Sequence, residues 1–138
     1  MEILNDPDVE HGMTTQNYTI LYDAIVTAIN EQIKDRKIKF MGLSLKKYTN
    51  YQYFSYFLNK SNHVNKDIPI AYISFNFFAG CDESVNCTQS DPDTYTSFFS
   101  QANVFITAVE ENISKTRDAL APDVKIDIDE IGIGMNDN

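Results

Sequence analysis

Tryptophan is absent from this chain, and glycine, proline, cysteine and histidine are scarce, with 5, 4, 2 and 2 residues respectively. So little glycine and proline excludes collagen-like and low-complexity classes, and two cysteines are too few for a disulfide-rich scaffold. No apolar run approaches the length of about 18 residues at which a membrane-spanning helix is expected. The N-terminal residues include acids and no Lys or Arg, so we expect no secretion through a signal peptide.

Aromatic residues are plentiful by contrast, with 9 Phe and 8 Tyr among 138 residues. This apolar area is enough to offset the entropy of ordering the chain, and the length suits one domain. Residues 1–14 contain few apolar side chains, and we predict that they form an extended N-terminal arm. Residues 15–138 are predicted to form a single α+β domain.

Acidic residues outnumber basic ones by 20 to 11, and the net charge of −9 argues against a protein that wraps duplex nucleic acid. Residues 1–33 hold six acids and no Lys or Arg, residues 34–66 hold eight bases and one acid, and residues 67–138 hold thirteen acids and three bases. Such segments indicate a solvated charged surface, head-to-tail self-association of basic against acidic segments, or an acidic site for a partner.

Two stretches have the apolar spacing of amphipathic helices. The first begins at Thr15, has Thr14 or Thr15 as its cap, and carries basic residues near its end. The second begins at Asp91, continues for about 28 residues and is stopped by Pro122.

Four stretches are predicted to be strands, at residues 37–48, 51–58, 68–78 and 124–135. In the first and the last, the alternation of apolar residues changes phase, beside Gly42 and at Asp129 with Glu130. Such a change is typical of a β-bulge or of a strand end. Residues 51–58 are apolar on both faces of a strand, which indicates cover on both sides or aromatic side chains presented to a partner.

The predicted order of elements is therefore α-β-β-β-α-β. We expect an α+β fold in which a mainly antiparallel sheet of about four strands has two helices packed on one face. Before the second helix, residues 80–90 are predicted to form an acidic loop with both cysteines, Cys81 and Cys87. In the absence of a signal-peptide pattern, two free thiols are favoured over a disulfide.

Groups able to catalyse a reaction or to bind a metal are few. His11 and His63 have no partner motif, and we expect both to be solvated surface residues. Two oxygen-rich clusters do not match a calcium-binding loop, and their residues are Asp82, Glu83, Asn86, Asp91 and Asp93 in the loop and Asp6, Asp8, Glu10 and His11 in the arm. We therefore predict no enzyme, no cofactor and no metal; the alternative is an enzyme that uses Asp127, Asp129 and Glu130.

The most suggestive segment is KKYTNYQYFSYF at residues 46–57. Bases beside tyrosines on a strand suit a stacking platform for single-stranded nucleic acid, a protein interface, or a hairpin with one face in the core. The net charge and the excess of Tyr over Arg favour core packing or an interface over nucleic acid. The candidate interface residues are Lys46, Lys47, Tyr51, Tyr53 and Tyr56.

The element order resembles that of small phage tail-terminator or neck-completion proteins. The resemblance rests on an N-terminal helix, a strand introduced by a proline in DIPIAYI at residues 67–73, a loop, a later helix and a closing strand. Proteins of this group assemble into rings that join tail to head, so the resemblance implies a homo-oligomeric ring and a location in the cytoplasm or in a virion. Small acidic secretion chaperones, which dimerise, are similar in their mixture of helices and strands.

We therefore expect a non-enzymatic structural or assembly subunit whose partners are other copies of the chain. This hypothesis predicts that reversing the charges of Lys46 and Lys47 weakens self-association. The alternative is an acidic binding module, of the immunity, inhibitor or secretion-chaperone type, that masks a basic protein and is a stable monomer or dimer by itself. Neither hypothesis includes a membrane or duplex nucleic acid as a partner.

Overall fold

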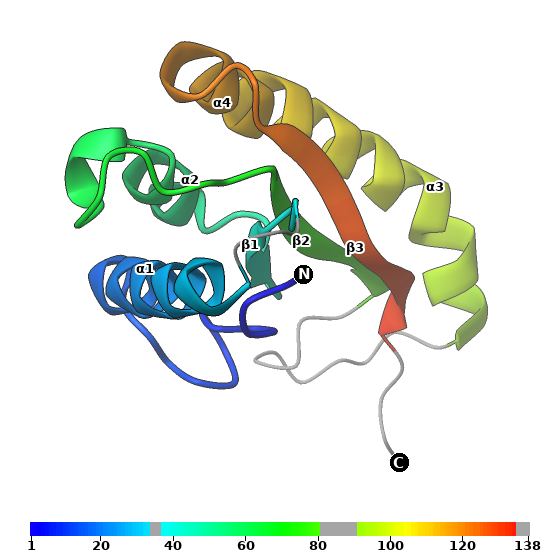
Figure 1. The fold of residues 1–138 in the computed structure, drawn as a ribbon. Helices are drawn as coiled ribbons and strands as arrows, with labels where there is room; N and C mark the ends of the chain where they lie inside the picture. Colours follow the sequence, from blue (N-terminus) through cyan, green and yellow to red (C-terminus); the bar gives the residue numbers. More distant parts are fainter. Residues whose placement is uncertain (34–36, 81–90, 135–138) are drawn as a thin grey trace.

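The computed structural model describes residues 1–33, 37–80 and 91–134 of the chain. Within these ranges it contains a three-stranded sheet with the spatial order β1-β2-β3 (Figure 1). Its strands are β1 (Met41–Leu45), β2 (Tyr72–Gly80) and β3 (Lys125–Gly134). Both pairings are parallel, so each connection has to return along the sheet, and each does so through a helix.

The helices are α1 (Thr15–Gln32), α2 (Tyr51–Phe57) and a long helix that precedes β3. A short 3-10 turn at Lys60–Asn62 follows α2. The long helix consists of α3 (Asp91–Ala108), a π-helical segment (Val109–Ser114) and α4 (Lys115–Leu120). No helix in the described ranges has both the length and the apolar character needed to span a bilayer.

The prediction of a four-stranded, mainly antiparallel sheet is wrong, although the chain does mix helices and strands. The main error is at residues 51–58, which form α2 and its C-cap and not a strand. The buried side chains of this segment are Tyr53, Phe54, Phe57 and Leu58, and they have the spacing of one face of a helix. Because a helix replaces the predicted strand, β1 and β2 are joined by a crossover and pair in parallel.

Several element boundaries agree with the sequence signals. The first helix begins at Thr15, and the Thr14 hydroxyl accepts a hydrogen bond of 3.2 Å from the Asn17 N–H. The second begins at Asp91 and its last turn ends at Leu120. The strands predicted at 37–48 and 68–78 are displaced, since β1 covers only Met41–Leu45 and β2 runs to Gly80. The loop predicted to hold Cys81 and Cys87 lies outside the described residues.

The phase change predicted in the last strand is a shift of register within β3. Phe75 of β2 pairs with Ile128, whereas Phe77 pairs with Ile131, so β3 has one residue more than β2 in this interval. This is the pattern of a β-bulge. The additional residue returns Ile131 to the face of the sheet on which Ile128 lies, and the isoleucines on both sides of the bulge therefore share one face.

A second register shift lies in β1, between Leu43 and Leu45. Leu43 and Ser44 have positive φ angles of 79° and 46°, a conformation that is uncommon for residues other than glycine. The predicted phase change beside Gly42 therefore corresponds to an irregular segment one to two residues further along the chain. Such strained segments persist where the surrounding structure holds them in place.

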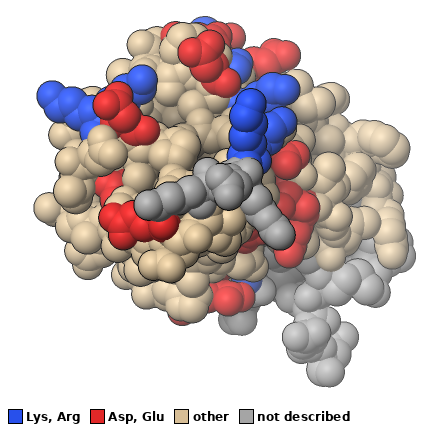
Figure 2. All heavy atoms as spheres, viewed as in Figure 1, with Lys and Arg blue, Asp and Glu red and all other residues tan. Residues whose placement is uncertain are grey.

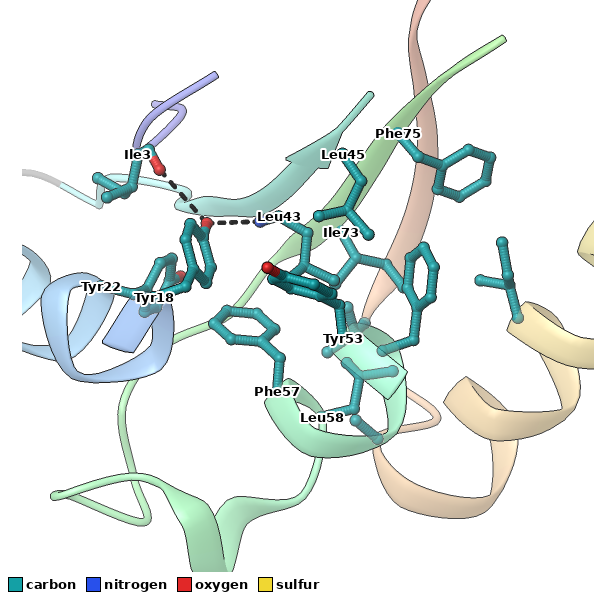
Figure 3. Packing of buried hydrophobic residues seen from close by; sticks show 14 of the residues in the cluster. Ile3, Tyr18, Tyr22, Leu43, Leu45, Tyr53, Phe57, Leu58, Ile73 and Phe75 are labelled. Carbon is teal, nitrogen blue, oxygen red and sulfur yellow. Dashed lines mark hydrogen bonds between the residues drawn. The ribbon is translucent and has the colours of Figure 1, made fainter. Parts of the chain in front are cut away.

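The hydrophobic core lies between the sheet and the helices (Figure 3). The ring of Phe75 in β2 meets Phe54 of α2 and Phe105 of α3, with ring centroids 5.6 Å and 5.9 Å apart. Tyr22 of α1 meets Phe57 of α2 edge to face at 4.8 Å. Because Phe75 points to one face of β2, α2 and α3 cover the same face, and alternation places Ser74 and Asn76 on the other.

An extended arm is predicted for residues 1–14, and its first six residues lie along β1. Glu2 forms a parallel bridge with Met41, and the Ile3 N–H donates to the Met41 carbonyl at 3.3 Å. Further along, the Asp6 N–H donates to the Ser44 carbonyl at 3.0 Å. The N-terminal segment therefore continues the sheet on the free side of β1 and reaches the strained residues at its end.

Candidate functional site

Buried polar side chains gather on the face of the sheet opposite the helices. Ser44, Ser74 and Asn76 are all fully buried, and they come from the irregular end of β1 and the middle of β2. The bulge in β3 brings Asp129 to the same place. Ser44 Oγ lies 2.6 Å from Asp129 Oδ2, although β2 separates their strands. The two irregularities therefore allow β1 and β3 to meet across β2.

The N-terminal segment closes this polar cluster. Asn76 Nδ2 donates to Asp6 Oδ1 at 3.0 Å, and Ser44 Oγ lies 2.9 Å from Asn5 Oδ1. A hydroxyl group has one hydrogen, so Ser44 donates in only one of these two contacts at a time. Two buried oxygens, Ser74 Oγ and Asn76 Oδ1, have no hydrogen-bond partner among the described residues.

Two carboxyl groups of the N-terminal segment bind protons more tightly than usual. Burial, and then the neighbouring Glu10, raise the pKa of Asp6 to about 6, against a smaller opposing effect of Lys46. Burial also raises the pKa of Glu2, with a contribution from Asp129. Both groups therefore accept a proton more readily here than in water.

A second polar cluster lies at the carboxyl end of β1 and binds the side chain of Asp8. The Lys46 N–H donates to Asp8 Oδ1 at 3.0 Å, and the Lys47 N–H donates to Asp8 Oδ2 at 3.1 Å. Asn50 Nδ2 donates to the same Oδ2 at 2.6 Å. We call the three donors, which are the N–H groups of Lys46 and Lys47 and the side-chain amide of Asn50, the carboxylate cradle.

The five predicted interface residues do not lie on one common surface. Lys46 and Lys47 supply backbone donors to the carboxylate cradle. Tyr53 is only 4% exposed, and its hydroxyl donates to the Met13 carbonyl. Tyr51 and Tyr56 lie half-buried on α2. Tyr53 therefore holds α2 against the N-terminal segment and offers almost no surface to a partner, and the other four residues stay predictions as interface residues.

His63 is buried, so the prediction of a solvated side chain is wrong for this residue, whereas His11 is exposed. His63 Nδ1 lies 2.6 Å from Asp23 Oδ1 of α1, and Nε2 lies 2.5 Å from the Phe57 carbonyl. The ring of His63 therefore connects the side chain of Asp23 on α1 with the backbone at the end of α2. The Asp23 carboxylate also accepts from the Val64 N–H at 2.7 Å. Sequence reasoning missed this link because Asp23 and His63 are 40 residues apart.

The acids considered for catalysis or metal binding do not converge on one point. Asp129 belongs to the polar cluster, while Asp127 and Glu130 are exposed. Among the residues that the structure describes, no group of three or more His, Cys, Asp and Glu is placed to hold a metal ion. The acids Asp82 and Glu83 lie outside the described ranges.

The outer surface of α3 has a different character, because residues 94–109 contain no charged residue. Tyr95, Phe99 and Ile106 of this helix are 57%, 75% and 51% exposed. Their spacing places them on one stripe beside the side that Phe105 buries, and we call these three residues the apolar stripe. Figure 2 shows the flank on which α3 lies as an uncharged surface, whereas side chains of both signs lie close together elsewhere on that face.

Outside the apolar stripe, two further surfaces carry exposed apolar side chains. On the side of α3 opposite the stripe, Val104 is 64% exposed and borders a shallow hollow of about 420 Å³. The hollow extends into the π-helical segment, a form of helix that is frequent at functional sites. On β3, the last strand of the described sheet, Ile128 and Ile131 are 38% and 63% exposed.

Comparisons of the chain with protein-family models, with curated proteins and with solved structures found no match. The resemblance to phage tail-terminator or neck-completion proteins stays a prediction.

Proposed function

We propose that this protein is a non-enzymatic assembly subunit that associates with other copies of itself through the apolar stripe of α3. The supporting observation is the exposure of Tyr95, Phe99 and Ile106 on a helix without charge over residues 94–109. Removal of apolar surface from water is worth roughly 25 cal/mol per Å². Contiguous exposed apolar side chains of this size are typical of interaction surfaces.

A second copy is a better partner for this surface than a basic protein. The net charge of −9 makes two copies repel each other over most of their surfaces. The repulsion is smallest where no charge is present, so the apolar stripe is the surface on which two copies can approach. A basic protein would instead be attracted to acidic surface, which α3 does not provide between residues 94 and 109.

The free edge of β3 is a second surface for the same assembly. Among the described residues, no strand pairs with the outer edge of β3, so its N–H and C=O groups are available to a partner strand. The exposed Asp127 and Glu130 oppose indiscriminate pairing at this edge. The edge of β3 is therefore a separate contact surface, at which a strand of another copy can pair, in addition to the stripe. A location in the cytoplasm or in a virion is part of this proposal.

The proposal is tested by Phe99→Asp with Val64→Asp as the matched control. Val64 is 83% exposed in the loop after His63, so its substitution introduces the same charge at an exposed apolar position away from α3. Size-exclusion chromatography with light scattering should show an oligomer for the parent chain and for Val64→Asp. Phe99→Asp should be monomeric, with an unchanged circular dichroism spectrum.

A monomeric parent chain, or a Phe99→Asp variant that keeps the parent's mass, would show that the stripe does not join copies. If the parent is monomeric and captures one basic protein in a fixed ratio, the protein is an acidic binding module and the assembly proposal is wrong.

A further inference from the structure

We propose that the carboxylate cradle is a binding site for an external oxyanion, a carboxylate or a phosphate. In the protein without such a ligand, the side chain of Asp8 occupies this site. The inference does not depend on association through α3, because none of its residues lies on that helix.

The geometry of the cradle is that of an anion site. Two successive backbone N–H groups, from Lys46 and Lys47, each donate a hydrogen bond to a different oxygen of one carboxylate, at 3.0 Å and 3.1 Å. Asn50 adds a side-chain donor at 2.6 Å. Successive N–H groups that converge on one anion form a concave site whose fixed partial charges favour negative ligands. The donors belong to the loop between β1 and α2, and the first turn of α2 contributes none of them.

The cradle lies at the carboxyl end of β1, in a charged part of the sequence. The cradle begins at the residue that follows β1, which ends at Leu45. Asp8 is only half-buried in the cradle. The charged residues near the bound carboxylate in the sequence are Lys46 and Lys47 on the side of the donors and Asp6 and Glu10 in the segment of Asp8.

An external anion has to displace one side chain and not the whole N-terminal segment. The residues after Asp8 form a turn, in which the Val9 and Glu10 N–H groups donate to the Asp6 carbonyl at 3.2 Å and 3.0 Å. Val9 and Glu10 are exposed. The bridge between Glu2 and Met41 holds the start of the segment independently. The side chain of Asp8 can therefore leave the cradle while residues 1–3 and Asp6 remain bound to the sheet.

The test is a titration of the Asp8→Ala variant, followed by the amide signals in ¹H–¹⁵N NMR spectra. Sodium phosphate and sodium acetate are added in separate experiments at matched ionic strength, with sodium chloride as the control salt. The proposal expects saturable shifts of the Lys46 and Lys47 amide signals with one or both oxyanions and none with chloride. The oxyanion that saturates at the lower concentration identifies the ligand as phosphate-like or carboxylate-like.

Two further variants make the test specific. The double variant Asp8→Ala with Asn50→Ala should bind the same anion about tenfold more weakly, because one donor to a charged group is lost. The parent chain should need a higher concentration than Asp8→Ala, because Asp8 competes. If Asp8→Ala loses its folded spectrum, Asp8→Asn, which keeps the size of the side chain, replaces it.

Absence of shifts in a folded variant, or equal shifts with chloride, would overturn the proposal. Loss of the fold in both Asp8 variants would also overturn it, because Asp8 would then be a structural residue and not an exchangeable occupant.

Discussion

At the scale of single residues, a few buried polar groups connect segments that are far apart in the sequence. Tyr18 of α1 is fully buried, and its hydroxyl accepts from the Leu43 N–H at 2.5 Å and donates to the Ile3 carbonyl at 3.3 Å (Figure 3). Burial raises the pKa of Tyr18 far above its usual range, so the hydroxyl keeps its proton as a donor. This one group therefore joins α1, the strained end of β1 and the N-terminal segment.

Tyr18→Phe should lower the free energy of unfolding by about 1 to 3 kcal/mol, because it leaves the buried Leu43 N–H without a partner. Tyr22→Phe is the matched control, since it removes only a hydrogen bond of 2.8 Å to the carbonyl of the exposed Pro69. Urea denaturation measures both. A cost for Tyr18→Phe equal to or below that for Tyr22→Phe would contradict this role of Tyr18.

The raised pKa of Asp6 makes stability depend on pH. The folded state binds the proton of Asp6 up to about pH 6, whereas the usual pKa is 3.8. The neutral carboxyl therefore contributes stability that is complete below about pH 4 and is lost as the pH rises through about 6. In Asp6→Asn, which keeps an oxygen for the Asn76 amide, the loss of stability from pH 4 to pH 7 should be smaller by about 1 to 3 kcal/mol.

Urea denaturation at pH 4, 5.5 and 7 measures this difference, and Asp67→Asn, at an exposed position, is the control. An Asp6→Asn variant with the same pH dependence as the parent would show that Asp6 is not the group that titrates.

His63 is the third residue with such a role, because it links α1 to the loop after α2 through Asp23. His63→Gln should lower the free energy of unfolding by about 1 to 3 kcal/mol, since the buried Asp23 carboxylate loses its hydrogen-bond partner on the imidazole ring. His11→Gln, at an exposed position, should have no effect on thermal denaturation. Equal melting temperatures for the two variants would contradict a structural role of His63.

At the scale of elements, the sequence predicted those features that depend only on residues close together in the chain. The Thr14 cap, the start of α3 at Asp91 and the register shift in β3 all follow from residues that are neighbours in the sequence. The seven-residue α2 was missed because its aromatic side chains lie on both faces when placed on a strand. Because of that error, the sheet was predicted to be mainly antiparallel, whereas β1 and β2 pair in parallel. The pairing of Asp23 with His63 left no signal in the sequence, because it arises only when α1 packs against α2.

Gly42 is required where α1 and α2 approach β1. A Cβ atom at Gly42 would lie 2.5 Å from Phe57 Cζ and 3.2 Å from Tyr22 Cε2, and both rings are buried. Gly42→Ala should therefore destabilise the protein by about 1 to 3 kcal/mol through overpacking. Gly132→Ala is the control, because its nearest neighbour at 3.0 Å is the partly exposed ring of Phe78, which can move. Thermal denaturation that ranks Gly132→Ala as the more harmful would contradict this packing.

At the scale of the whole molecule, part of the charge asymmetry is balanced within one chain. The acidic N-terminal segment places Asp8 on the backbone of Lys46 and Lys47, which belong to the basic segment. Charge reversal at these lysines would therefore act on the docking of the N-terminal segment as well as on any contact between copies. The surface without charge, on α3, is the more direct basis for association.

The most direct measurement is the molar mass of the parent chain by size-exclusion chromatography with light scattering, at low and at high salt. Association through the apolar stripe predicts an oligomer that persists or strengthens in high salt, because salt screens the repulsion between acidic copies and leaves apolar burial intact. A monomer at both salt concentrations, or an oligomer that dissociates in high salt, would contradict the account.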